Sequence, residues 1–209
     1  MSEHYPFENK PLPYKYDALE PYIDEKTMYL HHDKHLQTYI HNLNNALRDH
    51  SRLQKMTLEQ LILISGKLPE NVGLPIWRNA GGVYNHRFYF QGMTPSSTKR
   101  PLGALAEAID KNFGSFENFR KKFTDAAMSV FGSGYAWLVS DGRGNLNIMT
   151  TPNQDTPLPD GLCPILNIDV WEHAYYLKNY NKRDEYIGNW WHVVNWLKAN
   201  ERYLICKKG

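Results

Sequence analysis

The chain has 209 residues, and its 24 Lys and Arg against 22 Asp and Glu give a net charge of +2 with His neutral. This length suits one large domain or two small ones, and so weak a positive charge gives no support for nucleic-acid binding. The longest apolar run, Tyr135 to Val139, is far shorter than the roughly 20 residues of a transmembrane helix, which excludes a membrane span.

The N-terminus shows no basic and apolar pattern of a signal peptide, and two cysteines are too few for a disulfide framework. We therefore expect a protein of the reducing cytoplasm. Cys163 is expected to be a small buried apolar residue and Cys206 a free thiol.

The first half of the chain predicts helices. After an irregular segment over 1–20, apolar residues at helical spacing indicate a helix from Asp24 or Glu25 to about His50. A short helix over 57–66 has Thr57 as its N-cap and Gly66 as its C-cap. A loop is expected over 68–75 and a third helix over 77–91.

The second half mixes helices with strands. The polar segment 92–101, which contains two prolines, is the best linker candidate. Helices are expected over 103–112, 115–128, 172–180 and 184–199. Residues 135–140 and 145–150 predict a hairpin around Asp141-Gly-Arg-Gly144, and 162–168 is a candidate third strand. The pattern indicates a helical N-terminal half and an α+β C-terminal half.

A stripe of polar rings occupies one face of the first long helix. His31, His35 and Tyr39 share this face with Met28 and Asn42, because their spacings match the helical repeat. A single histidine is usually an ordinary packed or solvated residue. The whole stripe favours a site, because buried polar groups need partners.

Two further segments offer metal ligands. Asn85-His86 is a weak signal alone, whereas Asp169 and His173 lie four residues apart after an apolar strand and suit one metal as well as a surface pair. With His31, they supply three imidazoles and one carboxylate, which suits Mn, Fe or Zn. No thiolate lies near them, which argues against a structural zinc site, and spacing does not decide between a redox and a hydrolytic metal.

At these motifs the sequence resembles the iron/manganese superoxide dismutase family. Asp169-Val-Trp-Glu-His173-Ala-Tyr-Tyr176 matches the highly specific family signature D-x-W-E-H-A-Y-Y, and His31-His-Asp-Lys-His35 matches the first-helix motif. Asn85-His86, Pro152-Asn-Gln-Asp155 and the stretch from Asn181 to Trp196 match further segments. The resemblance covers nearly the whole chain.

The resemblance implies an α+β fold, with an N-terminal helical hairpin domain over 1–94 and a C-terminal domain over 95–209 that has a three-stranded antiparallel sheet flanked by helices. It implies one Mn per subunit, or Fe, held by His31, His86, Asp169 and His173. Tyr39 and His35 would lie at the substrate entrance, and Trp137 and Trp171 would form an apolar wall.

The implied activity is the conversion of superoxide to dioxygen and hydrogen peroxide by a metal that cycles between 3+ and 2+. Lys34 and Arg183 match the family's positive funnel, although ordinary surface charge is the simpler interpretation from sequence alone. A homodimer or homotetramer is implied, in which Glu172 meets His173 of the other subunit and His35 meets Tyr176.

The metal preference depends on a glutamine in this family. Iron-type members carry it four residues before the second ligand, where this chain has Gly82, so manganese is favoured. We place the glutamine of manganese-type members at Asn147, whose shorter amide predicts lower activity or a blurred metal preference. Arg78 stands near the implied dimer interface, where the family usually has Phe, and Tyr135 stands where manganese-type members often have Trp.

Three alternatives stay open. The first is an iron-dependent or dual-metal superoxide dismutase. The second is a metal-binding family member with little turnover because of Asn147, although all four ligand positions are intact. The third is a hydrolase, for which the sequence offers no evident general base.

Overall fold

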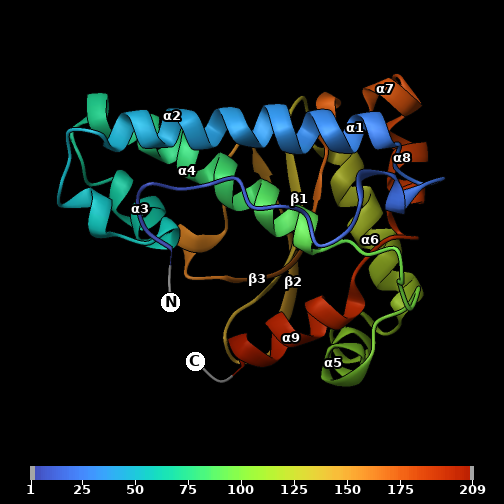
Figure 1. Ribbon diagram of the computed structural model, residues 1–209. Helices are drawn as coiled ribbons and strands as arrows, with labels where there is room; N and C mark the ends of the chain where they lie inside the picture. Colours follow the sequence, from blue (N-terminus) through green and yellow to red (C-terminus); the bar gives the residue numbers. More distant parts are fainter. Residues whose placement is uncertain (1–2, 208–209) are drawn as a thin grey trace.

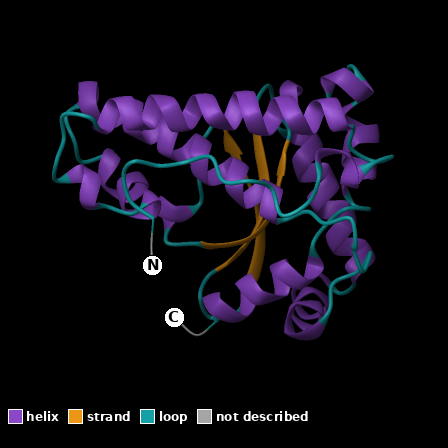
Figure 2. Ribbon diagram, in the orientation of Figure 1, coloured by secondary structure: helices purple, strands orange, loops and turns teal. Residues whose placement is uncertain are grey.

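The computed structural model describes residues 3–207. The long helical segment formed by α1 and α2 (25–47) crosses the top of the molecule in Figure 1, with α4 (Glu70–Gln91) beneath it. Helices α5 (Gly103–Phe113), α6 (Phe116–Ser129) and α9 (Trp196–Cys206) contact the three strands, and α8 (Arg183–Trp190) lies beside α7 (Tyr176–Asn179). Figure 2 shows the strands between the long helices and α9. The predicted α+β class, with helices first and a three-stranded antiparallel sheet later, is confirmed.

The first long helix is interrupted by a different helical geometry. It begins at α1 (Glu25–Leu30), where the Asp24 carboxylate caps the Thr27 backbone N–H at 3.0 Å, and it ends with α2 (Gln37–Leu47). Between them, His31–Leu36 forms a π-helical segment. π-Helical turns are rare and often mark functional sites. The predicted helix is therefore present, and the wider turn lies at the histidine motif.

The next two helices pack against each other. The predicted caps of α3 (Leu58–Ser65) are present, with the Thr57 hydroxyl accepting from the Gln60 N–H. The expected loop over 68–75 is wrong, because α4 spans Glu70–Gln91 and includes Pro75. Gly73 allows this early start: a Cβ there would lie 2.3 Å from the Ser65 carbonyl oxygen. Tertiary packing thus outweighs the local signal of Pro75.

The sheet has the order β2-β1-β3, and both pairings are antiparallel. Its strands are β1 (Gly134–Ser140), β2 (Leu146–Pro152) and β3 (Cys163–Asp169). Every residue of the central strand β1 is buried. The register places Tyr135 opposite Asp169. Asp169, a predicted metal ligand, therefore lies beside the start of the central strand.

The C-terminal helices differ from the prediction in one place. Helices α5 (Gly103–Phe113) and α6 (Phe116–Ser129) are present as expected, and 172–180 contains a short 3-10 turn followed by α7 (Tyr176–Asn179). The single helix expected over 184–199 is wrong. It is divided into α8 (Arg183–Trp190) and α9 (Trp196–Cys206).

The break between α8 and α9 has a clear physical cause. The Val193 carbonyl accepts from the Thr94 N–H at 2.7 Å, and the Asn195 N–H donates to the Gly92 carbonyl at 2.8 Å. These backbone groups bind the linker segment and are therefore not free to continue a helix. Asn195 then caps α9 through its side chain, which accepts from the Lys198 N–H.

The two cysteines form a disulfide, with 5.9 Å between their Cα atoms. The predictions of a small buried apolar residue at Cys163 and of a free thiol at Cys206 are therefore wrong, because α9 returns its last turn to the start of β3. The closed loop contains Asp169 and His173. A disulfide is typical of oxidising compartments, so the cysteine argument for a reducing cytoplasm no longer holds. The cytoplasmic location stays a prediction.

One hydrophobic cluster runs through both halves of the molecule, from Phe7 and Leu43 in the first to Leu138 and Trp196 in the second. The domain boundary between residues 94 and 95 stays a prediction. Within residues 3–207, no helix combines the length and the apolar character that a membrane span requires.

Candidate metal centre

Four side chains converge between the helical layer and the sheet. His31 comes from the π-helical segment, His86 from α4, Asp169 from the last residue of β3, and His173 from the 3-10 turn that follows. One donor atom from each lies within 4.8 Å of the others. His31, His86 and Asp169 are buried, and His173 is partly buried. The structure thus brings together the four predicted ligands from three distant segments.

The Asp169 carboxylate is at the middle of this group. Its Oδ2 atom lies 3.2 Å from His31 Nε2, 3.5 Å from His173 Nε2 and 3.9 Å from His86 Nε2. Its other oxygen, Oδ1, accepts from the Trp171 backbone N–H at 2.8 Å. One carboxylate oxygen is therefore held by the backbone, and the other faces the imidazoles.

The His86 ring is oriented in the same way. Its Nδ1 donates to the Gly82 carbonyl at 2.6 Å, one turn earlier on α4, which directs the lone pair of Nε2 towards Asp169. His86 Nε2 and Asp169 Oδ2 are buried and have no hydrogen-bond partner. Such buried unpaired atoms are costly unless something else binds them.

Three imidazole nitrogens and one carboxylate oxygen form a donor set that fits Mn or Fe. The unpaired Nε2 and Oδ2 atoms point into the space that a cation would fill. The residues present therefore fit the Mn or Fe ion that the family resemblance implies.

Burial sets the protonation states in the centre. It lowers the pKa of His31 to about 4 and that of His86 well below its usual value, so both rings are neutral at neutral pH. Burial opposes ionisation of Asp169, yet the closeness of its carboxylate to His173 and His31 lowers its pKa. Neutral imidazoles and an ionised carboxylate are the forms that bind a cation.

A hydrogen-bonded wall of Tyr39, Gln154 and Tyr135 lies next to the ligands. The Gln154 amide donates to the Tyr39 hydroxyl at 3.2 Å, and its carbonyl oxygen accepts from the Tyr135 hydroxyl at 3.1 Å and from the Asn85 amide at 3.2 Å. The Tyr135 hydroxyl also lies 3.5 Å from His86 Nδ1. This wall connects Tyr39 with a ligand through buried polar groups.

The prediction for Asn147 is wrong. Its side chain is exposed on β2, opposite Val139, and its amide oxygen accepts from the adjacent Ile148 N–H. Gln154, which follows β2, supplies the buried amide instead. The sequence signal was present in Pro152-Asn-Gln-Asp155, but strand alternation and spacing do not show which amide folds back towards Tyr39.

The glycine pair on α4 permits this close approach. A Cβ at Gly82 would lie 2.4 Å from Tyr39 Cδ1, and a Cβ at Gly81 would lie 2.2 Å from the backbone carbonyl oxygen of Gln154. A glutamine side chain at position 82 would therefore displace the Tyr39 ring. The structure accommodates one amide beside Tyr39, and it comes from Gln154.

Aromatic rings surround His173. The His35 ring stacks on it with 4.1 Å between centroids, and the Trp171 ring lies 5.4 Å away. Trp137 lies further back: it contacts the Tyr135 ring at 5.7 Å and donates to the Thr151 hydroxyl at 2.9 Å. His35 and Trp171 therefore contact the predicted ligand His173, whereas Trp137 packs against Tyr135.

The remaining predicted residues lie at the surface or bind elsewhere. Glu172 and Tyr176 are exposed. The Lys34 ammonium lies 5.5 Å from the centre of the Tyr29 ring. Arg183 donates to the carbonyls of Val130 and Gly132 at 2.6 and 2.8 Å, which fixes its guanidinium on the backbone.

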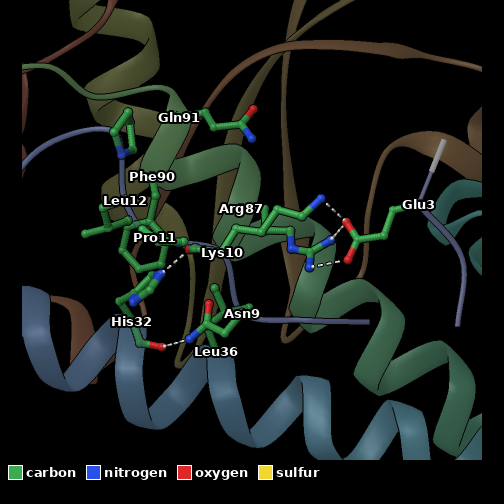
Figure 3. A pocket seen from close by; sticks show the side chains of 11 residues that line it. Glu3, Asn9, Lys10, Pro11, Leu12, His32, Leu36, Arg87, Phe90 and Gln91 are labelled. Atoms are coloured by element: carbon green, nitrogen blue, oxygen red, sulfur yellow. Dashed lines mark hydrogen bonds and ion pairs between the residues drawn. The ribbon is translucent and has the colours of Figure 1, made fainter. Parts of the chain in front are cut away.

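A separate cavity of about 320 Å³ lies between the N-terminal segment, the π-helical segment and α4 (Figure 3). His32 borders it and contacts the Lys10 carbonyl at 3.0 Å. Arg87 forms a bidentate ion pair with Glu3, which also pairs with Lys10. Unlike its neighbour His31, His32 thus binds the N-terminal segment, and the cations here are already paired.

Comparison with known proteins agrees with this geometry. Residues 6–94 match the family model described as iron/manganese superoxide dismutases, alpha-hairpin domain, and residues 101–202 match the C-terminal domain of the same family. The chain therefore belongs to the iron/manganese superoxide dismutase family.

Individual relatives are similar over most of their length. Superoxide dismutase (Mn) 1 of Leptolyngbya boryana is 51% identical over 95% of this chain and 81% of the relative. Superoxide dismutase (Mn) 2 of Bacillus anthracis is 48% identical over 95% of both chains. Superoxide dismutase (Mn) of Thermus thermophilus is 47% identical over 94% of this chain and 97% of the relative.

The close approach of Tyr39 to α4 predicts that Gly82→Ala destabilises the fold. The added Cβ must displace a half-buried ring, and we expect a loss of about 2 kcal/mol in the free energy of unfolding. Gly188→Ala on α8 is the matched control, because a Cβ there has no atom within 4 Å. The control should be neutral or gain up to about 1 kcal/mol. Denaturant unfolding of the metal-free proteins measures both, and equal stability of the two variants would contradict the packing described.

Proposed function

We propose that this protein is a superoxide dismutase that uses one manganese ion per chain. The observation that carries the proposal is the convergence of His31, His86, Asp169 and His173, in which the buried His86 Nε2 and Asp169 Oδ2 atoms have no hydrogen-bond partner. Family membership and the manganese enzymes among the relatives support it.

The bound metal would supply one-electron chemistry, alternating between its 3+ and 2+ states. One superoxide would lose an electron and leave as dioxygen. A second would gain an electron and two protons and leave as hydrogen peroxide. The protein must therefore admit a small anion, exclude bulk water and deliver protons.

Tyr39 is suited to deliver a proton. Its oxygen accepts from the Gln154 amide, so its own O–H is free to donate to another group. Burial raises the pKa of Tyr39, the Gln154 hydrogen bond opposes the rise, and the Asp169 charge adds to it. The phenol is therefore protonated at neutral pH and acts as a general acid. Gln154 and Tyr135 position it.

Manganese is favoured over iron by the source of the amide. The amide beside Tyr39 comes from Gln154, and position 82 is a glycine, as the sequence resemblance associates with manganese-type members. An iron-dependent or dual-metal enzyme is the alternative within the same chemistry. The case for a family member without turnover loses its main support, because Asn147 is not in the site.

The decisive experiment measures metal content and dismutation rate for protein reconstituted separately with Mn and with Fe. We expect one metal per chain in both and a higher rate per metal with Mn. Equal rates would favour the dual-metal alternative. A metal-loaded protein no faster than the free ion would overturn the proposed function.

A pair of amide variants tests the role of Gln154. Gln154→Ala removes the partner of Tyr39 and Tyr135, and we expect activity per metal to fall about 10- to 100-fold. Asn147→Gln changes an exposed side chain and should leave the rate unchanged. Steady-state rates of the Mn-loaded proteins measure the difference. A large effect of Asn147→Gln with none for Gln154→Ala would reverse the assignment.

We further propose that the protein is a homodimer or homotetramer. Its support is the exposure of His35 and Glu172 next to the ligand His173, together with the exposed Tyr176 and Phe131 rings. A second copy would cover these side chains and dry the centre. Light scattering of the metal-loaded protein should give at least twice the chain mass, and Glu172→Ala should reduce it. A single-chain mass for the unchanged protein would contradict the proposal.

A further inference from the structure

A cavity of about 480 Å³ opens beside the Tyr39–Gln154 pair. Tyr39, Gln154 and Trp171 line its side nearest the ligands, and Trp77, Arg78 and Asp155 line another part. The Trp171 ring lies 5.4 Å from the ring of the ligand His173. A small molecule in this cavity therefore lies next to both the proton donor and the metal centre.

Asp155 and Arg78 are the charged side chains that line the cavity, and only Asp155 has a hydrogen-bond partner in the part of the chain described. Asp155 is half-buried, and its Oδ1 accepts from the Trp77 indole N–H at 2.8 Å. Arg78 is exposed on α4 and makes no ion pair or hydrogen bond with any residue in the part of the chain described. The Arg78 guanidinium thus remains free to attract an anion, whereas the Asp155 carboxylate is held by the Trp77 indole.

The two cations that the family funnel suggests do not line this cavity. Arg183 is bound to two backbone carbonyls, and Lys34 lies over the Tyr29 ring. Arg78 is the cation that borders the cavity. It also stands at a position where the family resemblance leads one to expect Phe.

We propose that Arg78 captures the substrate anion for this cavity, as a specificity-determining residue of the site. The inference rests on the proposed function. Arg78 attracts superoxide from solvent and concentrates it at the Tyr39 side of the centre, opposing the repulsion from Asp155. It does not touch the metal ligands, so it acts on the capture step and not on electron or proton transfer.

Electrostatic capture has a recognisable kinetic pattern. A positive surface charge raises kcat/KM for an anionic substrate when ionic strength is low. Salt removes this effect once the screening length is shorter than the distance between the charge and the approaching anion. The turnover number kcat is unaffected, because the charge acts before chemistry. A packing role for Arg78 would not depend on salt.

The test uses the Mn-loaded, full-length protein and three variants. For Arg78→Gln we expect kcat/KM for superoxide to fall about two- to threefold at an ionic strength of about 10 mM and to reach the wild-type value near 0.5 M. Arg78→Lys keeps the charge and should retain the wild-type rate. Arg52→Gln removes an exposed arginine that does not line the cavity and is the matched control.

An equilibrium measurement separates this inference from the proposed function. Azide is a small monoanion, and its affinity for the metal centre is read from the absorption of the bound metal without turnover. At low salt we expect Arg78→Gln to weaken azide binding by a similar two- to threefold. If the wild-type protein binds azide but does not dismutate superoxide, the proposed function fails while the azide comparison still tests Arg78.

The outcomes that overturn the inference are specific. Identical kcat/KM and azide affinity for Arg78→Gln and wild type at every ionic strength would exclude capture by this charge. A loss in Arg78→Lys as large as in Arg78→Gln, or a loss that persists at high salt, would assign Arg78 a packing role instead.

Discussion

The structure depends on one buried carboxylate. Asp169 Oδ2 lies among three imidazole Nε2 atoms, with no Lys or Arg within ion-pair distance in the part of the chain described. Because Asp169 is fully buried, water cannot stabilise its negative charge, and groups of the protein or a bound cation must do so. The imidazoles, the Trp171 N–H and a bound cation are the partners that the geometry offers. This requirement brings β3, α4 and the π-helical segment to one point.

The layer around the ligands follows from the same convergence. Gly81 and Gly82 let α4 approach Tyr39 and the Gln154 backbone, and the Gln154 amide then holds Tyr39 with its O–H free. A side chain at either glycine would separate these groups. The arrangement places the donor set next to a phenol whose O–H has no acceptor in the described part of the chain, and a cavity lined by Arg78 adjoins the phenol.

Sequence patterns predict the sheet, because its strands carry local signals, whereas the full set of four donors follows from the family resemblance, since His86 is a weak signal alone. Strand alternation and the turn at Asp141 to Gly144 predict the hairpin. The spacing of Asp169 and His173 suits a surface pair as well as a metal, and it is the family signature around them that indicates the metal site. The helix break at 191–195 and the early start of α4 have no local signal, since both depend on contacts with distant segments. The Cys163–Cys206 bond likewise joins residues that are distant in sequence.

The role of Gln154 shows most clearly where sequence reasoning ends. The family resemblance implies an amide that sets the metal preference, but its assignment to Asn147 relies on a position along a strand. The choice between two amides seven residues apart depends on how the chain turns after β2 and on the space left by two glycines.

The coordination of manganese in the loaded protein tests the central claim most directly. X-ray absorption at the Mn edge should show one type of site with scattering from three imidazoles and one carboxylate, and Asp169→Ala should lose it. A spectrum without imidazole scattering, or one that Asp169→Ala leaves unchanged, would contradict the assignment of His31, His86, Asp169 and His173 as the metal centre.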